Sequence, residues 1–266
     1  MDDEPAVSAA EPPLRFTAHN IVLPGGEQTL PRRGVPLEDQ GSCQASLRTL
    51  RALFRAEEIP ASTIVDLGCL EGGFTVAFAR AGFQALGIEV RAQNFDKCEY
   101  VAEKLGLPNL RFVQDDVRNI EKHGPFDAVF CMGLLYHLDR PTEFLHTLAR
   151  STNRVLLLET HYATEELPTD AELAEKLGPM VEHEGNRGRW RYEYAEGAST
   201  EEVEGLLWSS WGNPSSFWIE KRHLLQTLRD AGFGMVYEQY DYLDDIVNDQ
   251  YIERNGRSLF VAVKDR

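Results

Sequence analysis

Four side chains suited to acid–base chemistry follow two apolar segments in the middle of the chain. Tyr136 and His137 come after the segment 126–131, and Glu159 and His161 end the next one. A histidine side chain titrates near pH ~6.5 when unperturbed, so it suits a base that removes a proton at neutral pH. We rank His137 first as the general base, with His161 or Glu159 second and Tyr136 as a catalytic neighbour. A purely structural hydrogen-bonding role for His137 stays an equal alternative.

The same groups offer a second use, the binding of a divalent cation. His137, Glu159 and His161 supply two imidazoles and a carboxylate that, with water, suit an ion such as Mg²⁺. The four cysteines of the chain include no C-x-x-C pair. Closely spaced ligand pairs are typical of zinc sites, so we expect reduced, mostly buried thiols instead.

A glycine-containing turn at residues 65–73, with the sequence VDLGCLEGG, indicates a ligand site of another kind. It stands where a β-rich segment gives way to a helical pattern. A dinucleotide-binding fingerprint needs a glycine two positions after Gly68, and Leu70 stands there instead. The turn therefore predicts close approach of the backbone to a ligand without a pyrophosphate.

Carboxylates at the ends of the next two β-rich segments complete this second site. Glu89 is placed to accept hydrogen bonds from both hydroxyls of a ribose. Asp115 and Asp116 follow the third segment, where a carboxylate suits an adenine amino group. The spacing to Val117 favours Asp116, although either aspartate is also a good cap for the next turn. Turn and carboxylates together describe the binding of an adenosine.

The elements that position these groups alternate between β-rich and helical patterns. This alternation predicts a parallel sheet covered by helices on both faces. Right-handed crossovers then bring the carboxyl end of every strand to one edge, where ligands bind. The expected strands are 63–67, 84–89, 110–113, 126–131 and 154–159, with two more at 234–239 and 258–264.

These segments resemble the ordered motifs of class I S-adenosylmethionine-dependent methyltransferases. The resemblance covers roughly residues 60–160 and is carried by 65–73, 87–89, 115–117 and 126–129. It implies an α/β, doubly wound, Rossmann-like sheet of seven strands whose last strand is antiparallel. It also implies S-adenosylmethionine as the cofactor.

The resemblance assigns the cofactor contacts by region. The turn surrounds the methionine end, Glu89 holds the ribose, Asp116 with Val117 holds the adenine, and the residues after 126–131 follow the other side. Leu70 replaces the family's usual second glycine, which leaves the loop's contacts near the ribose open. The cofactor-binding residues implied are Asp66, Gly68, Cys69, Gly72, Glu89, Asp115, Asp116, Val117, Met132 and Gly133.

Residues 162–216 interrupt the alternation and are first acidic, then rich in aromatic residues and arginine. A flexible linker would lack tryptophans, so we predict an inserted substrate cap here. Tryptophans that form the cap's own core are the alternative. The predicted substrate contacts are Arg189, Trp190, Trp208 and Trp211. We further expect a disordered tail at 1–13, an arm and helix at 14–58, and a core at 59–161 and 217–266, with a helix at 217–231.

Charge and hydropathy restrict the partners. The formal net charge is −16, which disfavours RNA, DNA and anionic membranes because nucleic-acid affinity rests on Lys and Arg. The chain has no apolar run of the ~18 residues that a membrane span needs. Its acidic start lacks the basic and apolar parts of a secretory signal, so we expect a cytoplasmic protein.

The leading hypothesis is methylation of a hydroxyl on a small molecule, with a saccharide or glycosylated metabolite ahead of a phenol. The segments 208–213 and 217–221 resemble bacterial methyltransferases of polysaccharide and natural-product pathways. A tRNA- or RNA-modifying methyltransferase is the second hypothesis, and a non-catalytic partner protein that keeps the cofactor site is the third. A homodimer is a further expectation.

Overall fold

The computed structural model describes residues 14–240 and 256–265, which form a seven-stranded sheet and a three-stranded sheet. The tail predicted at 1–13 lies outside the described residues. The strands of the larger sheet are β1 (Thr63–Leu67), β2 (Gln84–Glu89), β3 (Leu110–Gln114), β4 (Phe126–Met132), β5 (Thr152–His161), β9 (Phe233–Gln239) and β10 (Arg257–Lys264).

The larger sheet has the strand order β3-β2-β1-β4-β5-β10-β9. Strands β1 to β5 run parallel, while β10 pairs antiparallel with both β5 and β9. The winding switches between β1 and β4, and there Asp66 lies opposite both Gly87 and Phe130. The predicted doubly wound sheet with an antiparallel last strand is confirmed, and its switch point is where ligands bind in such folds.

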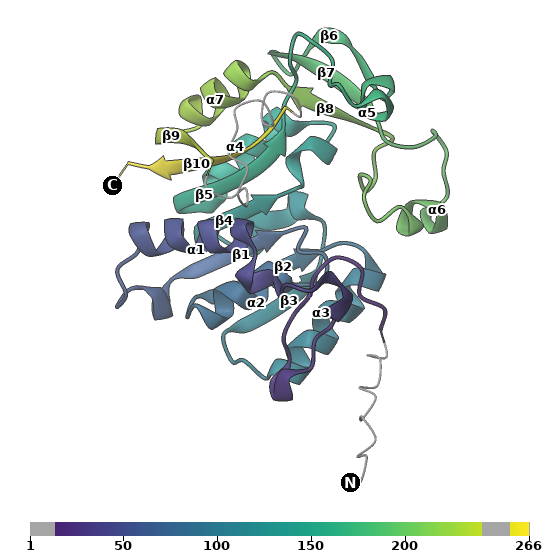
Figure 1. The fold of residues 1–266 in the computed structure, drawn as a ribbon. Helices are drawn as coiled ribbons and strands as arrows, with labels where there is room; N and C mark the ends of the chain where they lie inside the picture. Colours follow the sequence, from purple (N-terminus) through teal and green to yellow (C-terminus); the bar gives the residue numbers. More distant parts are fainter. Residues whose placement is uncertain (1–13, 241–255, 266) are drawn as a thin grey trace.

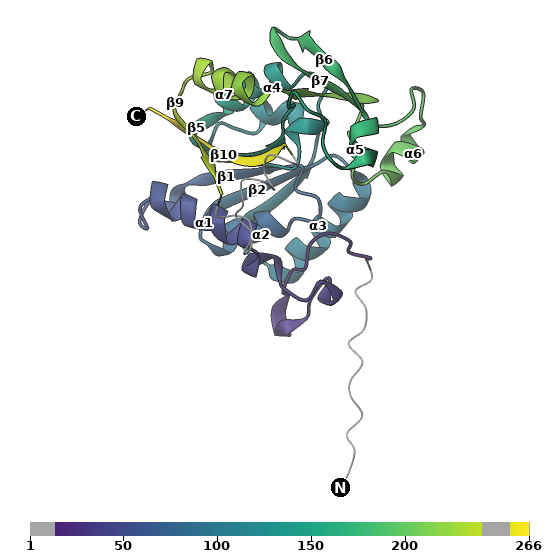
Figure 2. The same cartoon turned by 45° about the horizontal axis from the view of Figure 1, so that its top comes forward.

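Alternation along the central strands divides the core between two faces. In β4, Val129 and Cys131 belong to one buried cluster, and Ala128 and Phe130 belong to the other. Helices α4 and α7 pack on the first face, and α1, α2 and α3 lie on the second (Figure 1, Figure 2). These helices are α1 (Gly41–Leu53), α2 (Gly73–Arg80), α3 (Ala92–Leu105), α4 (Pro141–Ser151) and α7 (Lys221–Asp230).

The smaller sheet is antiparallel, in the order β6-β7-β8, and lies at the upper right of Figure 1 with two short helices. It occupies most of the predicted cap. The helices and strands of this region are α5 (Ala171–Glu175), β6 (Leu177–His183), β7 (Asn186–Tyr192), α6 (Thr200–Gly205) and β8 (Ser215–Ile219).

The predicted helix at 217–231 was wrong at its start. Residues 217–219 belong to β8, and α7 begins only at Lys221. Aromatic and β-branched residues favour a strand, and the buried Phe217, Trp218 and Ile219 pair with β7. The expected boundary between cap and core at 216 therefore falls inside β8.

The N-terminal arm is fastened to the turn that follows β1. Glu71 is fully buried, and its carboxylate accepts hydrogen bonds from the backbone N–H groups of Thr17 (2.7 Å), Ala18 (3.0 Å) and His19 (2.8 Å). Lys97 donates to the same carboxylate at 2.9 Å. One buried acid thus connects the arm, the turn and α3.

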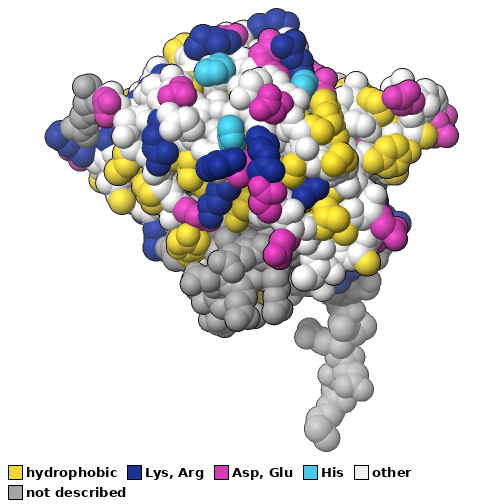
Figure 3. Space-filling model, turned by 90° about the horizontal axis from the view of Figure 1, so that it is seen from above, with side chains coloured by type: hydrophobic (Ala, Val, Ile, Leu, Met, Phe, Trp, Pro, Cys, Tyr) yellow, Lys and Arg dark blue, Asp and Glu magenta, His cyan; other side chains and the backbone are white. Residues whose placement is uncertain are grey.

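The surface of the molecule carries interspersed charges. Figure 3 shows acidic and basic side chains mixed on one face, with hydrophobic side chains gathered beside them. In the part of the chain that the structure describes, no helix is both long and apolar enough to cross a membrane.

Candidate active site

A cavity of about 410 Å³ lies where the ends of β1, β2 and β4 meet the cap. This volume is in the range of small-molecule sites. Of the sequence-predicted residues, those that line it are Asp66, Gly68, Cys69, Glu89, Asp116, Val117, Met132, Gly133, Tyr136, His137, His161, Trp208 and Trp211. The predicted residues outside the lining are Gly72, Asp115, Glu159, Arg189 and Trp190.

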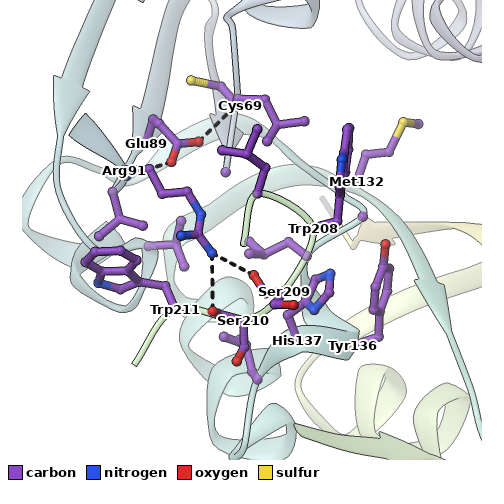
Figure 4. A pocket seen from close by; sticks show the side chains of 18 of the residues that line it. Cys69, Glu89, Arg91, Met132, Tyr136, His137, Trp208, Ser209, Ser210 and Trp211 are labelled. Atoms are coloured by element: carbon purple, nitrogen blue, oxygen red, sulfur yellow. Dashed lines mark hydrogen bonds between the residues drawn. The ribbon is translucent and has the colours of Figure 1, made fainter. Parts of the chain in front are cut away.

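Glu89 lines the cavity at the end of β2, and its side chain is shown in Figure 4. Its Oε2 accepts a hydrogen bond from the Leu70 N–H at 2.9 Å, and its Oε1 accepts from the Arg91 N–H at 2.8 Å. Burial raises the pKa of Glu89 to about 7, although these hydrogen bonds favour the ionised form. Hydroxyl donors of a ligand would stabilise this buried carboxylate further.

The backbone of the turn after β1 is left-handed at Leu70, a conformation that glycine usually provides. This leucine has a φ of +51°, in the left-handed region that normally favours glycine. The turn therefore adopts the left-handed conformation despite the substitution, and Leu70 stays in the cavity lining. The backbone N–H of Leu70 is the donor that reaches Glu89, which connects the turn to β2.

Two other predicted residues of this region support the turn. Asp66 is buried and accepts a hydrogen bond from Thr75 Oγ1 at 2.7 Å, and burial raises its pKa to about 7. Gly72 has a φ of +79° and is the N-cap residue of α2, where a Cβ would lie 2.6 Å from the Phe112 ring. Gly72 thus permits a close approach between α2 and β3.

The two adjacent aspartates that follow β3 have different surroundings. Asp115 accepts hydrogen bonds from Asn119 and from the His123 ring, both at 2.7 Å, and lies outside the cavity. Asp116 lines the cavity together with Val117. Of the two aspartates, Asp116 is therefore the one that a ligand in the cavity can reach.

His137 faces the cavity and is paired with a carboxylate that comes from the cap. Its Nδ1 lies 3.0 Å from Oε1 of Glu193, just beyond β7. Ser216 Oγ donates to the same oxygen at 2.7 Å, and Arg191 forms an ion pair with Glu193. Burial alone would raise the pKa of Glu193, but His137 and Arg191 outweigh burial and lower it to about 2.

An ionised carboxylate on Nδ1 decides which nitrogen of the ring carries the proton. The tautomer protonated at Nδ1 donates to Glu193 and leaves Nε2 of His137 as an acceptor. A carboxylate in this position also stabilises the imidazolium that forms after proton transfer. The arrangement suits a general base, and Glu193 is not among the catalytic residues that the sequence predicted.

The other two aromatic candidates form a stacked group next to His137. The His161 ring stacks on Trp218 at 4.5 Å with an interplanar angle of 11°, and Tyr136 meets His161 edge-on at 4.7 Å. The indole N–H of Trp218 donates to the Tyr136 carbonyl at 2.9 Å. These rings line the cavity beside His137.

Glu159 is held away from the cavity by Arg257. Its Oε2 accepts from Arg257 Nη2 and from the Gly133 N–H, both at 3.0 Å, and Oε1 contacts Arg257 Nε. Both carboxylate oxygens are therefore already paired. Within residues 14–240 and 256–265, no three His, Cys, Asp or Glu side chains gather as a metal site, so the suggested Mg²⁺ finds no ligand set there.

Two predicted substrate contacts serve the cap itself. Arg189 is buried, and its guanidinium donates to the carbonyls of Thr164, Gly178 and Glu165. The Trp190 ring packs against other aromatic rings of the cap's core. Trp190 therefore belongs to the cap's own core, which was the alternative to substrate contact, whereas Trp208 and Trp211 line the cavity.

His19 lines the cavity and is not among the residues that the sequence predicted for the site. It is buried, lines the cavity, and its Nδ1 accepts a hydrogen bond from the Gly73 N–H at 3.0 Å. Burial lowers its pKa to about 4, so the ring is neutral at pH 7. No periodicity in the arm signals this position, which depends on the docking of the arm on Glu71.

Comparison with known proteins agrees with this geometry. A family model described as "Methyltransferase domain" matches residues 64–155. The ubiquinone biosynthesis O-methyltransferase of Paracidovorax citrulli is 28% identical over 89 residues, 33% of this chain and 37% of that protein. The tRNA U34 carboxymethyltransferase of Desulfotalea psychrophila is 33% identical over 120 residues, 42% of this chain and 36% of that protein. The matches thus span well under half of these relatives.

Solved structures cover more of the chain. The N-terminal domain of EvdMO1 with S-adenosylhomocysteine bound is 26% identical, with a TM-score of 0.60 over 84% of this chain and 81% of that one. Another structure of that domain, in the presence of S-adenosylhomocysteine and D-fucose, has 24% identity and a TM-score of 0.62 over 91% and 88% of the two chains.

The chain contains a class I S-adenosylmethionine-dependent methyltransferase domain. The matched residues 64–155 include all of β1 except Thr63, the turn that follows it, and β2 to β4. They therefore contain every residue predicted to bind the cofactor. The cap and the arm lie outside the match.

Proposed function

We propose that this methyltransferase transfers a methyl group from S-adenosylmethionine to a hydroxyl group of a small molecule. The observation that supports this proposal most directly is the His137–Glu193 pair, which lies on the wall of the same cavity as Glu89. An alcohol is a poor nucleophile until its proton is removed, so hydroxyl methylation needs a base near the acceptor. A nitrogen acceptor with a free lone pair has less need of one.

The residues of the cavity divide into two groups with different roles. Glu89 would hold the ribose, Asp116 with Val117 the adenine, and the turn around Gly68 the methionine end. When bound, S-adenosylmethionine supplies an electrophilic methyl group. His137 Nε2 accepts the hydroxyl proton, and Glu193 stabilises the imidazolium that results. The surrounding aromatic side chains exclude water.

A saccharide or glycosylated metabolite is the proposed acceptor, ahead of a phenol. Trp208, Trp211 and Trp218 line the cavity, and aromatic faces are suited to stack on sugar rings. The chain is also similar to the N-terminal domain of EvdMO1, another structure of which was determined in the presence of the sugar D-fucose.

A panel of sugars, glycosylated metabolites and phenols with methyl-labelled S-adenosylmethionine tests the proposal. We expect label in a hydroxyl of at least one sugar-containing compound. Calorimetry with S-adenosylhomocysteine, run on the same protein, separates loss of cofactor binding from the wrong choice of acceptor. Label that moves only to nitrogen acceptors would contradict hydroxyl methylation.

A tRNA-modifying enzyme is the second candidate because of the likeness to a tRNA U34 carboxymethyltransferase. The formal net charge of −16 argues against it. A third candidate, a partner protein that binds the cofactor without turnover, would show bound S-adenosylhomocysteine but no label transfer to any compound in the panel.

We predict that a chelator will leave label transfer unchanged. Glu159 is paired with Arg257, and the proposed base is an imidazole that needs no metal. Rates measured with and without excess EDTA, after removal of bound metal by dialysis, check this. A rate that falls with EDTA and returns with Mg²⁺ would restore the metal hypothesis.

A further inference from the structure

Two arginines connect the proposed cofactor side to one segment of the cap, residues 203–213, which comprises the end of α6 and the loop after it. We call this segment the cap loop. Arg91 comes two positions after Glu89, and Arg118 comes two positions after Asp116. Both arginines line the cavity. Each is thus covalently close to a proposed cofactor contact while its side chain reaches toward the cap.

Arg91 makes the more extensive connection. It is 4% exposed, and its guanidinium donates hydrogen bonds to the carbonyls of Ser209 (2.9 Å), Ser210 (3.3 Å) and Val203. Its Cζ lies 5.1 Å from the centroid of the Trp211 ring. Figure 4 shows the guanidinium reaching the serine carbonyls across the cavity wall. The planar fork of an arginine is suited to bind several carbonyls at once.

Arg118 makes the second connection. Its Nη1 donates to Asp116 at 3.0 Å, and its Nη2 donates to the side chain of Asn213 at 2.9 Å and to Asp139 at 3.3 Å. Asn213 Nδ2 in turn donates to the backbone carbonyl of His137 at 3.0 Å. A continuous chain of contacts therefore leads from Asp116 to the backbone of His137.

The cap loop also reaches the side chain of His137. The Ser210 N–H donates to Oε2 of Glu193 at 3.3 Å, and Oε1 of Glu193 is the partner of His137 Nδ1. Ser210 Oγ contacts the Asn213 carbonyl, which joins the two routes within the cap loop. The position of His137 is consequently tied to the cap loop through both its ring and its backbone.

We propose that Arg91 and Arg118 are positioning residues that fasten the cap loop over the occupied cofactor site and so place His137 for the acceptor. The inference rests on the proposed function. Residues 207–211 and Glu89 line one cavity, so a cofactor bound there would lie beside the cap loop as well as the strand ends. A ligand that touches both stabilises the fastened state over any open one. The acceptor site is therefore completed after the cofactor binds.

Arg189 provides a matched control. It too is buried and donates to three backbone carbonyls within the cap, but it lies outside the cavity lining. Its replacement disturbs the cap to a similar extent without cutting either route to His137. The variants to compare are Arg91→Met, Arg118→Met and Arg189→Met in the full chain.

Hydrogen exchange of the cap loop, with and without S-adenosylhomocysteine, tests the inference without an identified acceptor. In the wild type and in Arg189→Met we expect the ligand to slow cap-loop exchange on the order of tenfold. In Arg91→Met and Arg118→Met calorimetry still detects binding, but most of this protection is lost. The ligand-induced change in tryptophan fluorescence, to which Trp208 and Trp211 contribute, follows the same pattern.

The outcomes separate the two proposals. Binding of S-adenosylhomocysteine to the wild type without protection of the cap loop overturns the inference and leaves the proposed function standing. The inference is equally overturned if both arginine variants keep as much protection as Arg189→Met. If Arg91→Met does not fold, Arg118→Met carries the test, because its side chain is 39% exposed. Absence of any binding to the wild type overturns both proposals.

Discussion

At the scale of single residues, the chemistry of the cavity depends on partners that are distant in the sequence. His137 is paired with Glu193, and Glu159 with Arg257. The first pairing orients a proposed base toward the cavity, while the second removes another candidate from it. Four residues of similar type near two strand ends thus acquire different roles.

We predict that His137→Ala lowers turnover of the acceptor found in the panel by about 10²–10⁴-fold, the usual contribution of a general base. Glu193→Gln keeps the shape of the pair but loses the charge, so we expect an intermediate loss. His223→Ala, which changes a histidine outside the cavity lining, serves as the control. Initial rates and calorimetry with S-adenosylhomocysteine measure both effects. Full turnover by His137→Ala would move the base elsewhere.

Glu89 illustrates the conflict between binding and stability. A carboxylate of pKa about 7 holds a proton in the folded protein at pH values where the unfolded chain, with an ordinary value of 4.5, has released it. The folded state therefore binds more protons than the unfolded state between these values. Stability without ligand must fall as the pH rises through this window.

Glu89→Gln removes this titration. From pH 5 to pH 8 the wild type loses stability because Glu89 must release its proton, and Glu89→Gln does not. We therefore expect the free energy of unfolding of the variant, minus that of the wild type, to be larger at pH 8 than at pH 5 by up to about 3 kcal/mol, because each pKa unit corresponds to about 1.4 kcal/mol. Urea denaturation without ligand at the two pH values measures the difference. The same variant loses affinity for S-adenosylhomocysteine. If the difference in free energy of unfolding between variant and wild type is the same at pH 5 and pH 8, Glu89 is ionised at both pH values.

At the scale of elements, the turn after β1 is a junction between the sheet and the arm. Glu71 accepts hydrogen bonds from consecutive N–H groups of residues 17–19 and from Lys97, while Leu70 in the same turn reaches Glu89. The docked arm then places His19 in the cavity. The turn therefore supports a wall of the cavity that comes from outside the sheet.

Glu71→Ala is predicted to destabilise the protein by about 3–5 kcal/mol, because it leaves the buried Lys97 without its partner. Hydrogen exchange of residues 17–19 should rise more than exchange in α4. Urea denaturation gives the change in stability. Glu121→Ala, which breaks the exposed ion pair with Arg150, is the control and should cost less than about 1 kcal/mol. Equal effects of the two variants would contradict the proposed junction.

At the scale of the whole molecule, charge sets the class of partner. The formal net charge is −16, and the face shown in Figure 3 mixes acidic with basic side chains. The arginines of the cavity are largely engaged with carboxylates and carbonyls of the protein itself, as Arg91 and Arg118 illustrate. The proposed small-molecule acceptor therefore fits this surface better than a polyanion does.

We predict that unfractionated tRNA binds more weakly than a Kd of about 10⁻⁴ M at physiological salt, the weak end of non-specific nucleic-acid binding. Fluorescence anisotropy with labelled tRNA, repeated at several salt concentrations, measures it. Micromolar affinity with a steep dependence on salt would favour the tRNA-modifying candidate instead.

The sequence by itself determined the sheet and the strand ends at which we propose that the cofactor binds. Alternating β-rich and helical patterns, the turn at 65–73 and the acids after two strands are local features, and local features are readable from one chain. The strand that begins at Ser215 was missed because its pairing partner, β7, decides between strand and helix there. Propensity yields to tertiary contacts in such short segments.

Only the tertiary structure decided which candidate faces the cavity. Asp116 lines the cavity and Asp115 does not, and His19 also belongs to the lining. Glu159 is paired with Arg257 outside the lining, and His137 is paired with Glu193. The pairing of His137 with Glu193 and that of Glu159 with Arg257 join side chains that lie 56 and 98 residues apart in the sequence. The physical reason is that a buried carboxylate or imidazole must find a hydrogen-bonding partner, and the folded chain alone decides which partner is near.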